Sequence, residues 1–538
     1  MHSFLVTTFS LIVLAVSVIA LLQWLISPRR DPREPPYLPT STPIFGHLFG
    51  VLGQGADYYR LMDEKHPGVG LYGLPMLNGR MYIVSSAEWA TALEKRSNRS
   101  VSLELMIVDV IGKVFCFDEK TVAILKDNLF GEDGSRPNLT MENHKLIHGS
   151  LAPGDELEEL KERTLDNVSR QVNTLAQAVD ADEVTVLGLW SWIKEHLSQS
   201  ALQAFYGPDS PVTSDSALMK DFWVWEENIQ VLMMSPAPSI LARDAYLARE
   251  RWLRAWEKYV QEGRYKGASK FIQDRANLHM KEFGLTQEAY GRAESGTPHA
   301  LLVNMVPSSF WFISYIFQDP ALLADIRQEL DRCVTRKGNR YEISVSKLRT
   351  SCPLFGSTFK ETLRIVAPLH TNRVIAEDTL VTNPSDGQTC LIKKGATIQY
   401  ASTLIHRNES VWGNDANDFQ PRRFLPMFEK STEGKGIDPA TSYRDGSGRV
   451  HTGSFRSFGG GFNVCPGRHF AEAEVQGIAA LFCAAFDMHG EGGEAFIAPP
   501  VEKANGFLFT AAVKPAHDVQ VRLGRRKGYE DVHWTLTL

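Results

Sequence analysis

The stretch SFGGGFNVCPGRHFAEAE, residues 457–474, places one cysteine, Cys465, between a run of glycines and the start of a predicted helix. Gly459, Gly460 and Gly461 allow backbone conformations and close approaches that a Cβ atom would block. A thiolate just before a helix N-terminus is stabilised by the helix dipole, which lowers its pKa. A disulfide needs no such setting, and a zinc site needs further ligands close by. Two interpretations remain: a thiolate that binds a metal centre, or a buried structural cysteine beside a flexible loop.

Four motifs follow one another along the chain, and together they resemble the signature of the cytochrome P450 family. They are Glu361-x-x-Arg364 in FKETLRI, the run HRNESVWGNDANDF (406–419), FQPRRF with Phe419, Pro421, Arg423 and Phe424, and Phe458-x-x-Gly461-x-x-x-Cys465-x-Gly467. The first motif alone is a weak signal, because any surface helix can hold an i,i+3 ion pair. The resemblance covers about residues 35–520. It implies one catalytic domain with a mostly α fold and small β-sheets.

The resemblance implies a cofactor, heme b (iron protoporphyrin IX), and assigns residues to it. Cys465 would be the proximal ligand of the iron, in a loop shaped by Phe458, Gly461 and Gly467. The family's buried charge network would consist of Glu361, Arg364 and Arg423 and would support the loop that leads to the heme. Arg373, in HTNRVI, stands where the family often pairs an arginine with a heme propionate; the alternative is an arginine on a surface strand.

The sequence departs from the family pattern at the heme edge. Two residues before the cysteine, where the family usually has His or Arg, stands Asn463, which can donate a hydrogen bond but carries no charge. The usual W-x-x-x-R pair is also absent from the segment ENHKLIHG. His144, Lys145 and His148 stand there instead, either as heme partners or as part of a solvated helix face.

A second departure lies in LLVNMVPSSFWF, which aligns with the family's oxygen-binding helix. Val303 and Asn304 occupy the positions of the usual acid–alcohol pair, and we assign both to the catalytic site. Pro307 lacks the N–H that would bond the Val303 carbonyl, and its ring disturbs the turn. Asn304 could hold a water for proton delivery or hydrogen-bond a substrate, but it is no ordinary general acid. The alternative is a packing variant.

The N-x-x-P arrangement is similar to one branch of the superfamily, which holds sterol 7α- and 12α-hydroxylases and prostacyclin synthase. Two functions therefore follow. The first is a monooxygenase that oxidises an apolar small molecule, such as a terpenoid, a steroid, a related lipid or a compound of secondary metabolism, using O2 and NADPH-derived electrons. The second is an electron-independent isomerase or dehydratase that acts on a peroxide. Fold-level analogy does not decide between them.

The N-terminal segment and the net charge indicate where the protein is located and which partners it has. Residues 1–27 contain an uncharged apolar run long enough to span a bilayer, and residues 28–40 are a proline-rich linker before the catalytic domain, 41–538. Basic residues follow the run, so we expect a single-pass anchor in the endoplasmic reticulum with a cytosolic domain. The implied electron donor is NADPH–cytochrome P450 reductase, with cytochrome b5 as a further candidate. A net charge of −6 argues against nucleic acid.

Hydrophobic periodicity gives the expected elements. Helices are predicted over 155–179, 320–336 and 468–486, where apolar residues recur at helical spacing. Alternation of apolar and polar residues around Asn-Pro-Ser-Asp-Gly predicts strands within 380–402. The six cysteines form no CxxC pair, which suits a reducing compartment rather than a disulfide scaffold.

Overall fold

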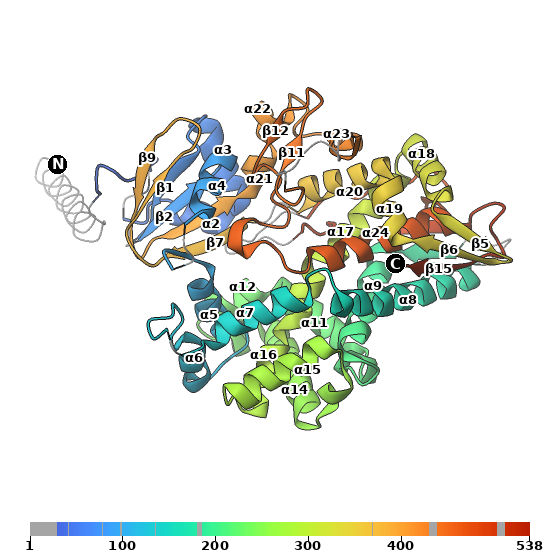
Figure 1. The fold of residues 1–538 in the computed structure, drawn as a ribbon, viewed down its shortest axis with the longest axis horizontal. Coiled ribbons are helices and arrows are strands. Elements are labelled where there is room, and N and C mark those ends of the chain that lie inside the picture. The colour runs from blue at the N-terminus through green and yellow to red at the C-terminus, as the bar shows by residue number, and fades with distance from the viewer. Residues whose placement is uncertain are drawn as a thin grey trace, which may run out of the picture.

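A computed structural model describes residues 30–40, 42, 44–77, 79–96, 99–134, 136–179, 185–367, 370–429, 438–502 and 512–538. The predicted anchor, residues 1–27, and the first two residues of the predicted linker lie outside the described residues. The described part of the chain is rich in helices with small sheets, as predicted. Figure 1 shows the sheet that contains β1, β2 and β7 at one end of the molecule, and the long helices at the other end together with the sheet of β5, β6 and β15.

The described part of the linker, residues 30–40, packs against the domain. The Leu38 N–H donates to the Gly73 carbonyl at 3.0 Å. Glu34 is buried, and its carboxylate accepts a hydrogen bond from the Tyr82 hydroxyl at 2.6 Å. Because a buried carboxylate must be hydrogen-bonded, these contacts hold the segment in one place. Any element that precedes residue 30 is therefore joined to the sheet at a fixed point.

In the described part of the chain, the strands form five small sheets. The largest runs in the order β1 (Leu71–Pro75), β2 (Arg80–Val84), β10 (Thr397–Ala401), β7 (His370–Ile375) and β3 (Val101–Ser102), and its one parallel pair is β2 with β10. The others are β13 (Phe486–Gly490)–β14 (Gln520–Arg525)–β4 (Thr185–Gly188), β15 (His533–Thr537)–β6 (Arg340–Ser344)–β5 (Val334–Lys337), β8 (Thr379–Thr382)–β9 (Thr389–Ile392), and β11 (Tyr443–Arg444)–β12 (Val450–His451). The predicted strands within 380–402 correspond to most of β8, to β9 and to β10.

Helices make up the rest of the regular structure. They are α2 (Leu48–Gln54), α3 (Ala56–Lys65), α4 (Ala87–Glu94), α5 (Leu103–Val114), α6 (Glu119–Lys126), α7 (Leu139–Ser150), α8 (Asp155–Ala178), α9 (Leu189–Tyr206), α10 (Pro211–Ser214), α11 (Ala217–Glu227), α12 (Ile229–Met234), α13 (Pro238–Leu241), α14 (Arg243–Gln261), η1 (Arg264–Gly267), α15 (Lys270–Ala276), η2 (Asn277–Glu282), α16 (Gln287–Glu294), α17 (Gly296–Phe317), α18 (Pro320–Asp331), α19 (Val345–Ser351), α20 (Pro353–Val366), α21 (Ser402–His406), α22 (Glu409–Trp412), α23 (Leu425–Glu429), η3 (Gly461–Asn463) and α24 (Arg468–Ala485). The predicted helices over 155–179 and 468–486 correspond to α8 and α24.

Helix α17 is the centre of the core. It packs against α9, α20 and α24, and most of its side chains from Leu302 onward are buried. Among the described residues, one helical stretch, Gln287–Phe317, is long and apolar enough to cross a membrane, yet 78% of its most apolar window is buried inside the protein. A helix that is apolar on every side is the expected pattern for such a central position.

Helix α18 is shorter than predicted. The pattern predicts a helix over 320–336, but α18 ends at Asp331 and Val334 begins strand β5. Val334 and Thr335 are β-branched, which favours a strand, and the neighbouring strand β6 supplies the antiparallel partner. The prediction of this boundary was wrong because the pairing with β6 outweighs the helical periodicity.

A buried polar cluster joins three helices below the core. The fully buried Glu294 carboxylate of α16 accepts hydrogen bonds from Tyr206 at 2.7 Å, from Tyr290 at 2.8 Å and from the Arg275 guanidinium of α15 at 3.1 Å. Both oxygens of the carboxylate thus accept hydrogen bonds, and a cation lies beside it, which is the condition under which a buried charge is tolerated. The end of α9, α15 and α16 are held together by this one carboxylate.

Replacing Glu294 with glutamine should lower the free energy of unfolding by about 3–5 kcal/mol, because Arg275 is left as an uncompensated buried charge. Urea unfolding at one pH measures the change. Glu159→Gln is the matched control, since its partner Arg163 is exposed and such pairs contribute about 0.5 kcal/mol. Equal unfolding midpoints for the two variants would contradict the expected role of Glu294.

Candidate functional site

The loop before Cys465 is closed by backbone contacts. Gly459 and Gly461 have φ angles of +72° and +64°, in the left-handed region that favours glycine. A Cβ atom on Gly461 would also lie 2.8 Å from the Cβ atom of Glu94. The Cys465 N–H donates to the Phe458 carbonyl at 2.8 Å, which turns the chain back on itself. The glycines are therefore required by the turn and by the close approach of α4.

The sulfur of Cys465 faces hydrogen-bond donors from the start of α24. Loss of contact with water raises the pKa of the Cys465 thiol, whereas the N–H groups of Gly467 and Arg468 and the charge of Arg468 act in the opposite direction. A metal cation reverses the effect of burial, because a coordinating thiol is deprotonated outright. The setting fits a thiolate that ligates a metal, as the sequence predicts.

The predicted charge network is present and buried. Arg364 donates to both oxygens of Glu361, each at 2.7 Å, and the Arg423 Nε atom donates to Glu361 Oε1 at 3.0 Å. The remaining guanidinium N–H groups bond carbonyls: Arg364 bonds those of His406 and Ala416, at 2.7 and 2.6 Å. Arg423 also donates to the Asp415 carboxylate, at 3.0 Å. Glu361 is therefore shared by two guanidiniums, and Asp415 and backbone carbonyls accept their other hydrogen bonds.

His406 connects this network to the cysteine loop, a role that its place in the HRNESVW motif did not reveal. Its Nε2 atom accepts the Arg456 N–H at 2.8 Å, so the proton must sit on Nδ1, which bonds the Arg364 carbonyl at 3.0 Å. Burial first, and then the Arg364 charge, lower the pKa of His406 to about 3. The ring is therefore neutral at physiological pH and fixes the loop that leads to Cys465.

Arg373 lies on β7 without an acidic partner. Its residue is only 6% exposed, and burial lowers the pKa of its guanidinium. Within the described ranges, no carboxylate lies within ion-pair distance; its contacts are the Asn372 carbonyl at 2.9 Å and the Tyr400 ring at 5.5 Å. Arg456, which lies 5.3 Å from the centre of the same ring, is paired with Glu94. A buried cation without an anion calls for an anionic ligand.

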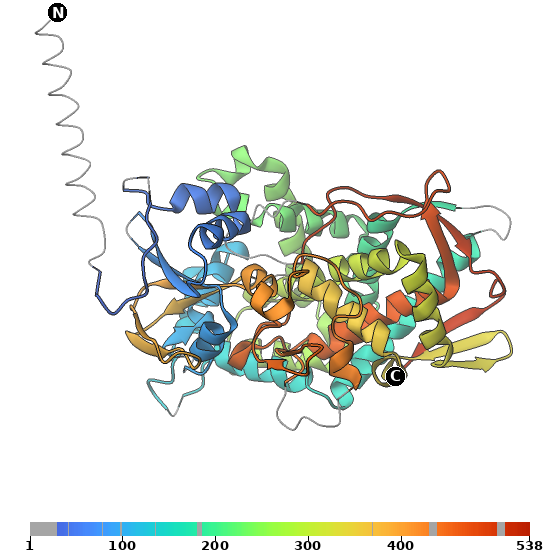
Figure 2. The same cartoon turned by 90° about the horizontal axis from the view of Figure 1, so that it is seen from above.

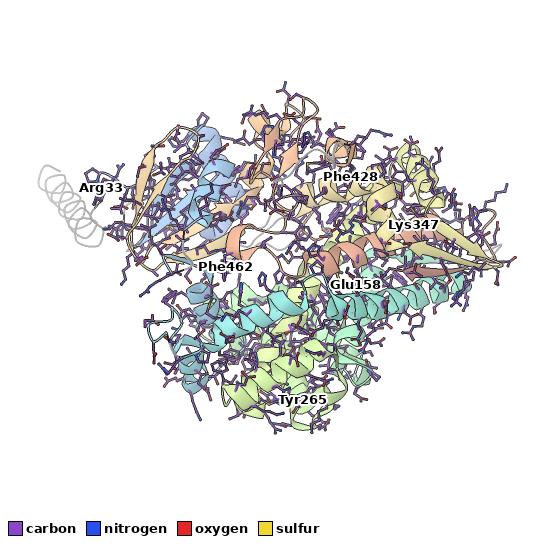
Figure 3. All side chains as sticks on the ribbon, viewed as in Figure 1. Arg33, Glu158, Tyr265, Lys347, Phe428 and Phe462 are labelled. Atoms are coloured by element: carbon purple, nitrogen blue, oxygen red, sulfur yellow. The ribbon has the colours of Figure 1, made fainter. Side chains whose placement is uncertain are left out.

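Helix α7 also reaches the cysteine loop. The His144 ring stacks on Phe462 of that loop with centroids 4.5 Å apart, and it also stacks on His148 at 4.2 Å. Figure 3 shows Phe462 where the loop faces α7. Burial lowers the pKa of both histidines. Lys145 instead is exposed and pairs with Glu142, so of this trio His144 contacts the loop and His148 stacks on His144.

Asn304 and Val303 lie on α17, which packs against α24 just beyond Cys465. The helix continues through Pro307 without a break, so the disturbance expected from the proline does not end it. The Asn304 side-chain oxygen accepts the Ala512 N–H at 2.9 Å. Sequence reasoning missed this bond, since 208 positions separate the two residues. Val303 is buried beside Asn304.

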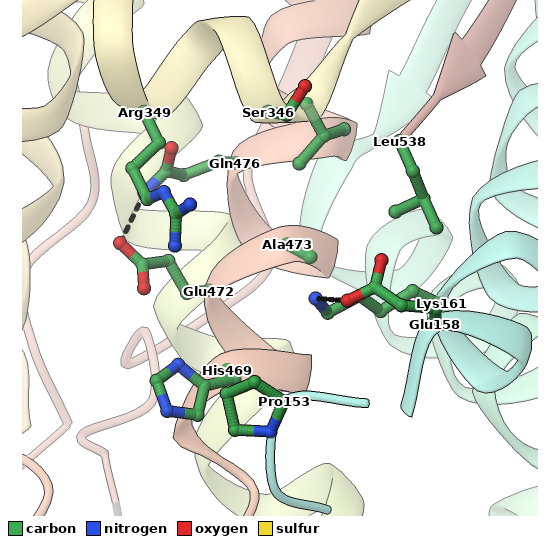
Figure 4. Close-up of a pocket in the computed structure, with 11 residues that line it drawn as sticks. Pro153, Glu158, Lys161, Ser346, Arg349, His469, Glu472, Ala473, Gln476 and Leu538 are labelled. Atoms are coloured by element: carbon green, nitrogen blue, oxygen red, sulfur yellow. Dashed lines mark hydrogen bonds and ion pairs between the residues drawn. The ribbon is translucent and has the colours of Figure 1, made fainter. Parts of the chain in front are cut away.

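A cavity of about 210 Å³ lies on another side of α24, between α8 and α19. Two polar pairs lie in it: Lys161 pairs with Glu158 at 2.9 Å, and Gln476 donates to Glu472 at 3.3 Å (Figure 4). None of the residues that line it belongs to the predicted site. We therefore place the candidate site between α17 and the Cys465 loop.

The residues present fit a heme. Cys465 offers a sulfur, Arg373 a cation without an anion, and Asn463 a buried side-chain oxygen without a hydrogen-bond partner among the described residues. Arg373, Asn463 and the pair His144 and His148 would hold its polar edge, and Cys465 would bind the iron.

Comparison with known proteins points the same way. The family model "Cytochrome P450" matches residues 304–509. The chain is 26% identical over 528 residues to a cytochrome P450 monooxygenase of Gibberella zeae, covering 97% of this chain and 94% of that protein. It is 21% identical to the 7-alpha-hydroxycholest-4-en-3-one 12-alpha-hydroxylase of Oryctolagus cuniculus, covering 95% of this chain and 97% of that protein.

The fold has a solved counterpart. The structure of retinoic-acid-bound cyanobacterial CYP120A1 superposes with a TM-score of 0.64 at 15% identity and covers 92% of this chain and 100% of that one. At this identity the likeness concerns the fold alone.

Replacing Arg373 with methionine should have opposite effects on the protein without heme and on the heme complex. Without heme, the variant should be as stable as the parent or more stable, because an unpaired buried charge is removed. Heme should leave about ten times faster, since a charge-assisted hydrogen bond is lost. Thermal unfolding and transfer of heme to excess apomyoglobin measure the two effects. Arg456→Met is the control: it should destabilise the heme-free protein, because Glu94 loses its partner.

The buried His406 should make the fold sensitive to acid. Its pKa is about 3 in the folded chain and about 6.5 in an unfolded chain, so between these values only the unfolded state binds the proton. Stability should therefore fall as the pH falls, by about 2 kcal/mol at about pH 5. His406→Gln, which keeps an acceptor for Arg456, should lose less stability than the parent between about pH 7 and about pH 5. Urea midpoints measure this, with the exposed His489→Gln as control; identical pH profiles for parent and His406→Gln would refute it.

Proposed function

The chain belongs to the cytochrome P450 superfamily and is one of its monooxygenases, and on that premise we propose that it oxidises an apolar small molecule with O2 and electrons from NADPH. Heme b, when bound, supplies the one-electron and dioxygen chemistry. The observation that carries the proposal is the setting of Cys465, whose sulfur receives backbone N–H groups at the start of α24. Such donors stabilise the thiolate that defines this class of enzyme.

Asn304 is proposed to position a proton donor rather than to act as one. Its side-chain oxygen accepts the Ala512 N–H, so the amide NH2 is the group left to bond a water or a substrate oxygen. A carboxamide does not release a proton near neutral pH, so the proton itself must come from the bound water. Val303, which is apolar and buried, contributes shape to the site.

The substrate is proposed to be a terpenoid, a steroid or a related lipid or specialised metabolite. The sterol hydroxylase of Oryctolagus cuniculus acts on such a molecule, and its resemblance to this chain extends over almost the whole length. Trp223, Trp225 and Leu232 of α11 and α12 are buried and apolar, which suits a pocket wall near α17. The alternative reading, a peroxide isomerase, needs no reducing equivalents; oxidation of NADPH in the presence of reductase separates the two.

The surface supports an association with the endoplasmic reticulum membrane. Phe49 of α2 is 57% exposed, and Ile240 and Leu241 of α13 are 77% and 67% exposed. In Figure 2, α2 and the α12–α13 segment project from the same edge of the molecule. We propose that this edge rests on the bilayer that residues 1–27 span, with a cytosolic domain that accepts electrons from NADPH–cytochrome P450 reductase, and with cytochrome b5 as a second donor.

Cys465→Ser tests the proposed ligand. The variant should fold, because serine preserves the loop contacts of the backbone, but it should lose the carbon-monoxide difference spectrum of a thiolate-ligated heme and at least 99% of turnover with reductase, about two powers of ten. Cys483→Ser, at a buried position within α24, is the matched control and should retain both. Full turnover in Cys465→Ser would refute the assignment.

Asn304→Ala tests the positioning role. The change should lower the amount of product formed per NADPH about threefold to tenfold and raise hydrogen peroxide release, because the water loses its anchor. The heme spectrum should stay normal. Ser308→Ala, which removes a hydrogen bond to the Asn304 carbonyl in the same turn, is the control for helix packing. An unchanged ratio of product to NADPH in Asn304→Ala would contradict the role.

A further inference from the structure

Two cysteines far from the candidate site face each other in the core. The sulfur atoms of Cys333 and Cys352 lie 3.1 Å apart, and both residues are fully buried. The separation is less than the sum of the van der Waals radii of two sulfur atoms and about 1 Å more than an S–S bond. The other cysteines, among them Cys465 and Cys483, have no such neighbour in the described part of the chain.

The pair lies where two helices of the core meet. Cys333 follows α18, and Cys352 is the residue that precedes α20, the helix that carries Glu361 and Arg364. Glu329 of α18 already bridges the same junction, because its carboxylate accepts the N–H groups of Leu354 and Phe355 at 3.0 Å each. The two sulfur atoms are thus held in place by elements that do not depend on a bond between them.

The chemistry of the pair favours oxidation. The Cys352 thiol has the Cys333 sulfur at 3.1 Å and the Glu329 carbonyl at 3.5 Å within hydrogen-bond reach. The hydrogen bond between the two sulfur atoms lowers the pKa of the Cys333 thiol. The thiolate is the form of cysteine that attacks an oxidant. The Cys352 thiol already has the Glu329 carbonyl as an acceptor, so we assign Cys333 as the attacking sulfur and Cys352 as the resolving one.

We propose that Cys333 and Cys352 are an oxidation site that closes to a disulfide with hydrogen peroxide as the oxidant. Cys333 attacks one peroxide oxygen, which breaks the O–O bond, gives a sulfenic acid and releases one water. Cys352 then attacks that sulfur, forms the S–S bond and releases the second water. Two electrons pass from the thiols to the peroxide, and a dithiol reductant reverses the change.

The bond would join the end of α18 to the start of α20 and close the segment that contains β5, β6 and α19. Because the crosslink restricts the unfolded chain, the oxidised protein unfolds at a higher temperature than the reduced one. The burial of both sulfur atoms also selects the oxidant by size. Hydrogen peroxide reacts faster than oxidised glutathione, which is too large to enter a closed core.

The test uses the full-length protein with heme bound. One sample is treated with hydrogen peroxide and quenched with catalase, and a second is treated with diamide, a small thiol oxidant that becomes a hydrazine. Both are denatured in iodoacetamide and digested without reductant. We expect one crosslinked peptide pair that contains Cys333 and Cys352, two hydrogen masses below the reduced pair, and its disappearance after dithiothreitol. The thermal midpoint of the oxidised sample should rise by a few degrees.

Serine variants show which cysteines form the crosslink and raise the thermal midpoint. Cys333→Ser and Cys352→Ser should each abolish the crosslink and the rise in midpoint, whereas Cys483→Ser should retain both. The peptide map of the parent protein needs no variant, so a folding defect in either serine variant leaves the test intact. Complete alkylation of both cysteines after treatment with either oxidant, or crosslinks that involve other cysteines instead, would overturn the proposal.

Discussion

Two guanidiniums share one carboxylate in the core of this protein, and the loop that presents Cys465 depends on that arrangement. Glu361 alone cannot balance Arg364 and Arg423, so Arg423 also pairs with the Asp415 carboxylate, and both guanidiniums donate to backbone carbonyls of the segment 406–418. That segment must therefore adopt one conformation before the charges are satisfied. Segment 406–418, which is largely irregular, is therefore held in one conformation and supports the Cys465 loop.

A neutral histidine, His406, connects the Glu361 charge network to the Cys465 loop. The Arg364 carbonyl and the Arg456 N–H determine which ring nitrogen of His406 carries the proton. The Arg456 side chain in turn forms an ion pair with Glu94 of α4. A continuous series of hydrogen bonds thus runs from α20 to the glycines before Cys465. The geometry of the sulfur is set by contacts more than one layer away, which is the usual requirement for a well-defined ligand.

Local patterns predict part of this structure. The order of motifs around Glu361, Arg423 and Cys465 indicates the site, since each motif is a short run with its own spacing, and the structure brings the Glu361 network together as predicted. The hydrogen bond of Asn304 to Ala512, the partner of His406 and the contact of Cys333 with Cys352 were not predictable, because they join positions that no short-range periodicity relates. The end of α18 was misplaced for the same reason: its alternative partner, β6, is a separate strand.

The departures at Asn304 and Asn463 have a common physical meaning. At both positions an amide stands where relatives of the usual pattern carry an alcohol or a charged side chain, so neither residue can supply a proton or a counter-charge. At the proposed heme edge, Arg373 can supply the missing charge, whereas the histidines of α7, whose pKa is lowered by burial, can supply hydrogen bonds. Around Asn304 the amide oxygen instead ties α17 to the 512–514 segment, where Trp311 also bonds the Val513 carbonyl and Lys514 pairs with Glu226 of α11. The same helix therefore carries the proposed positioning residue and is tied through this segment to α11. A substitution at Asn304 acts on both, which explains why a sequence can keep the thiolate chemistry of its family while the shape of the site, and with it the substrate, diverges.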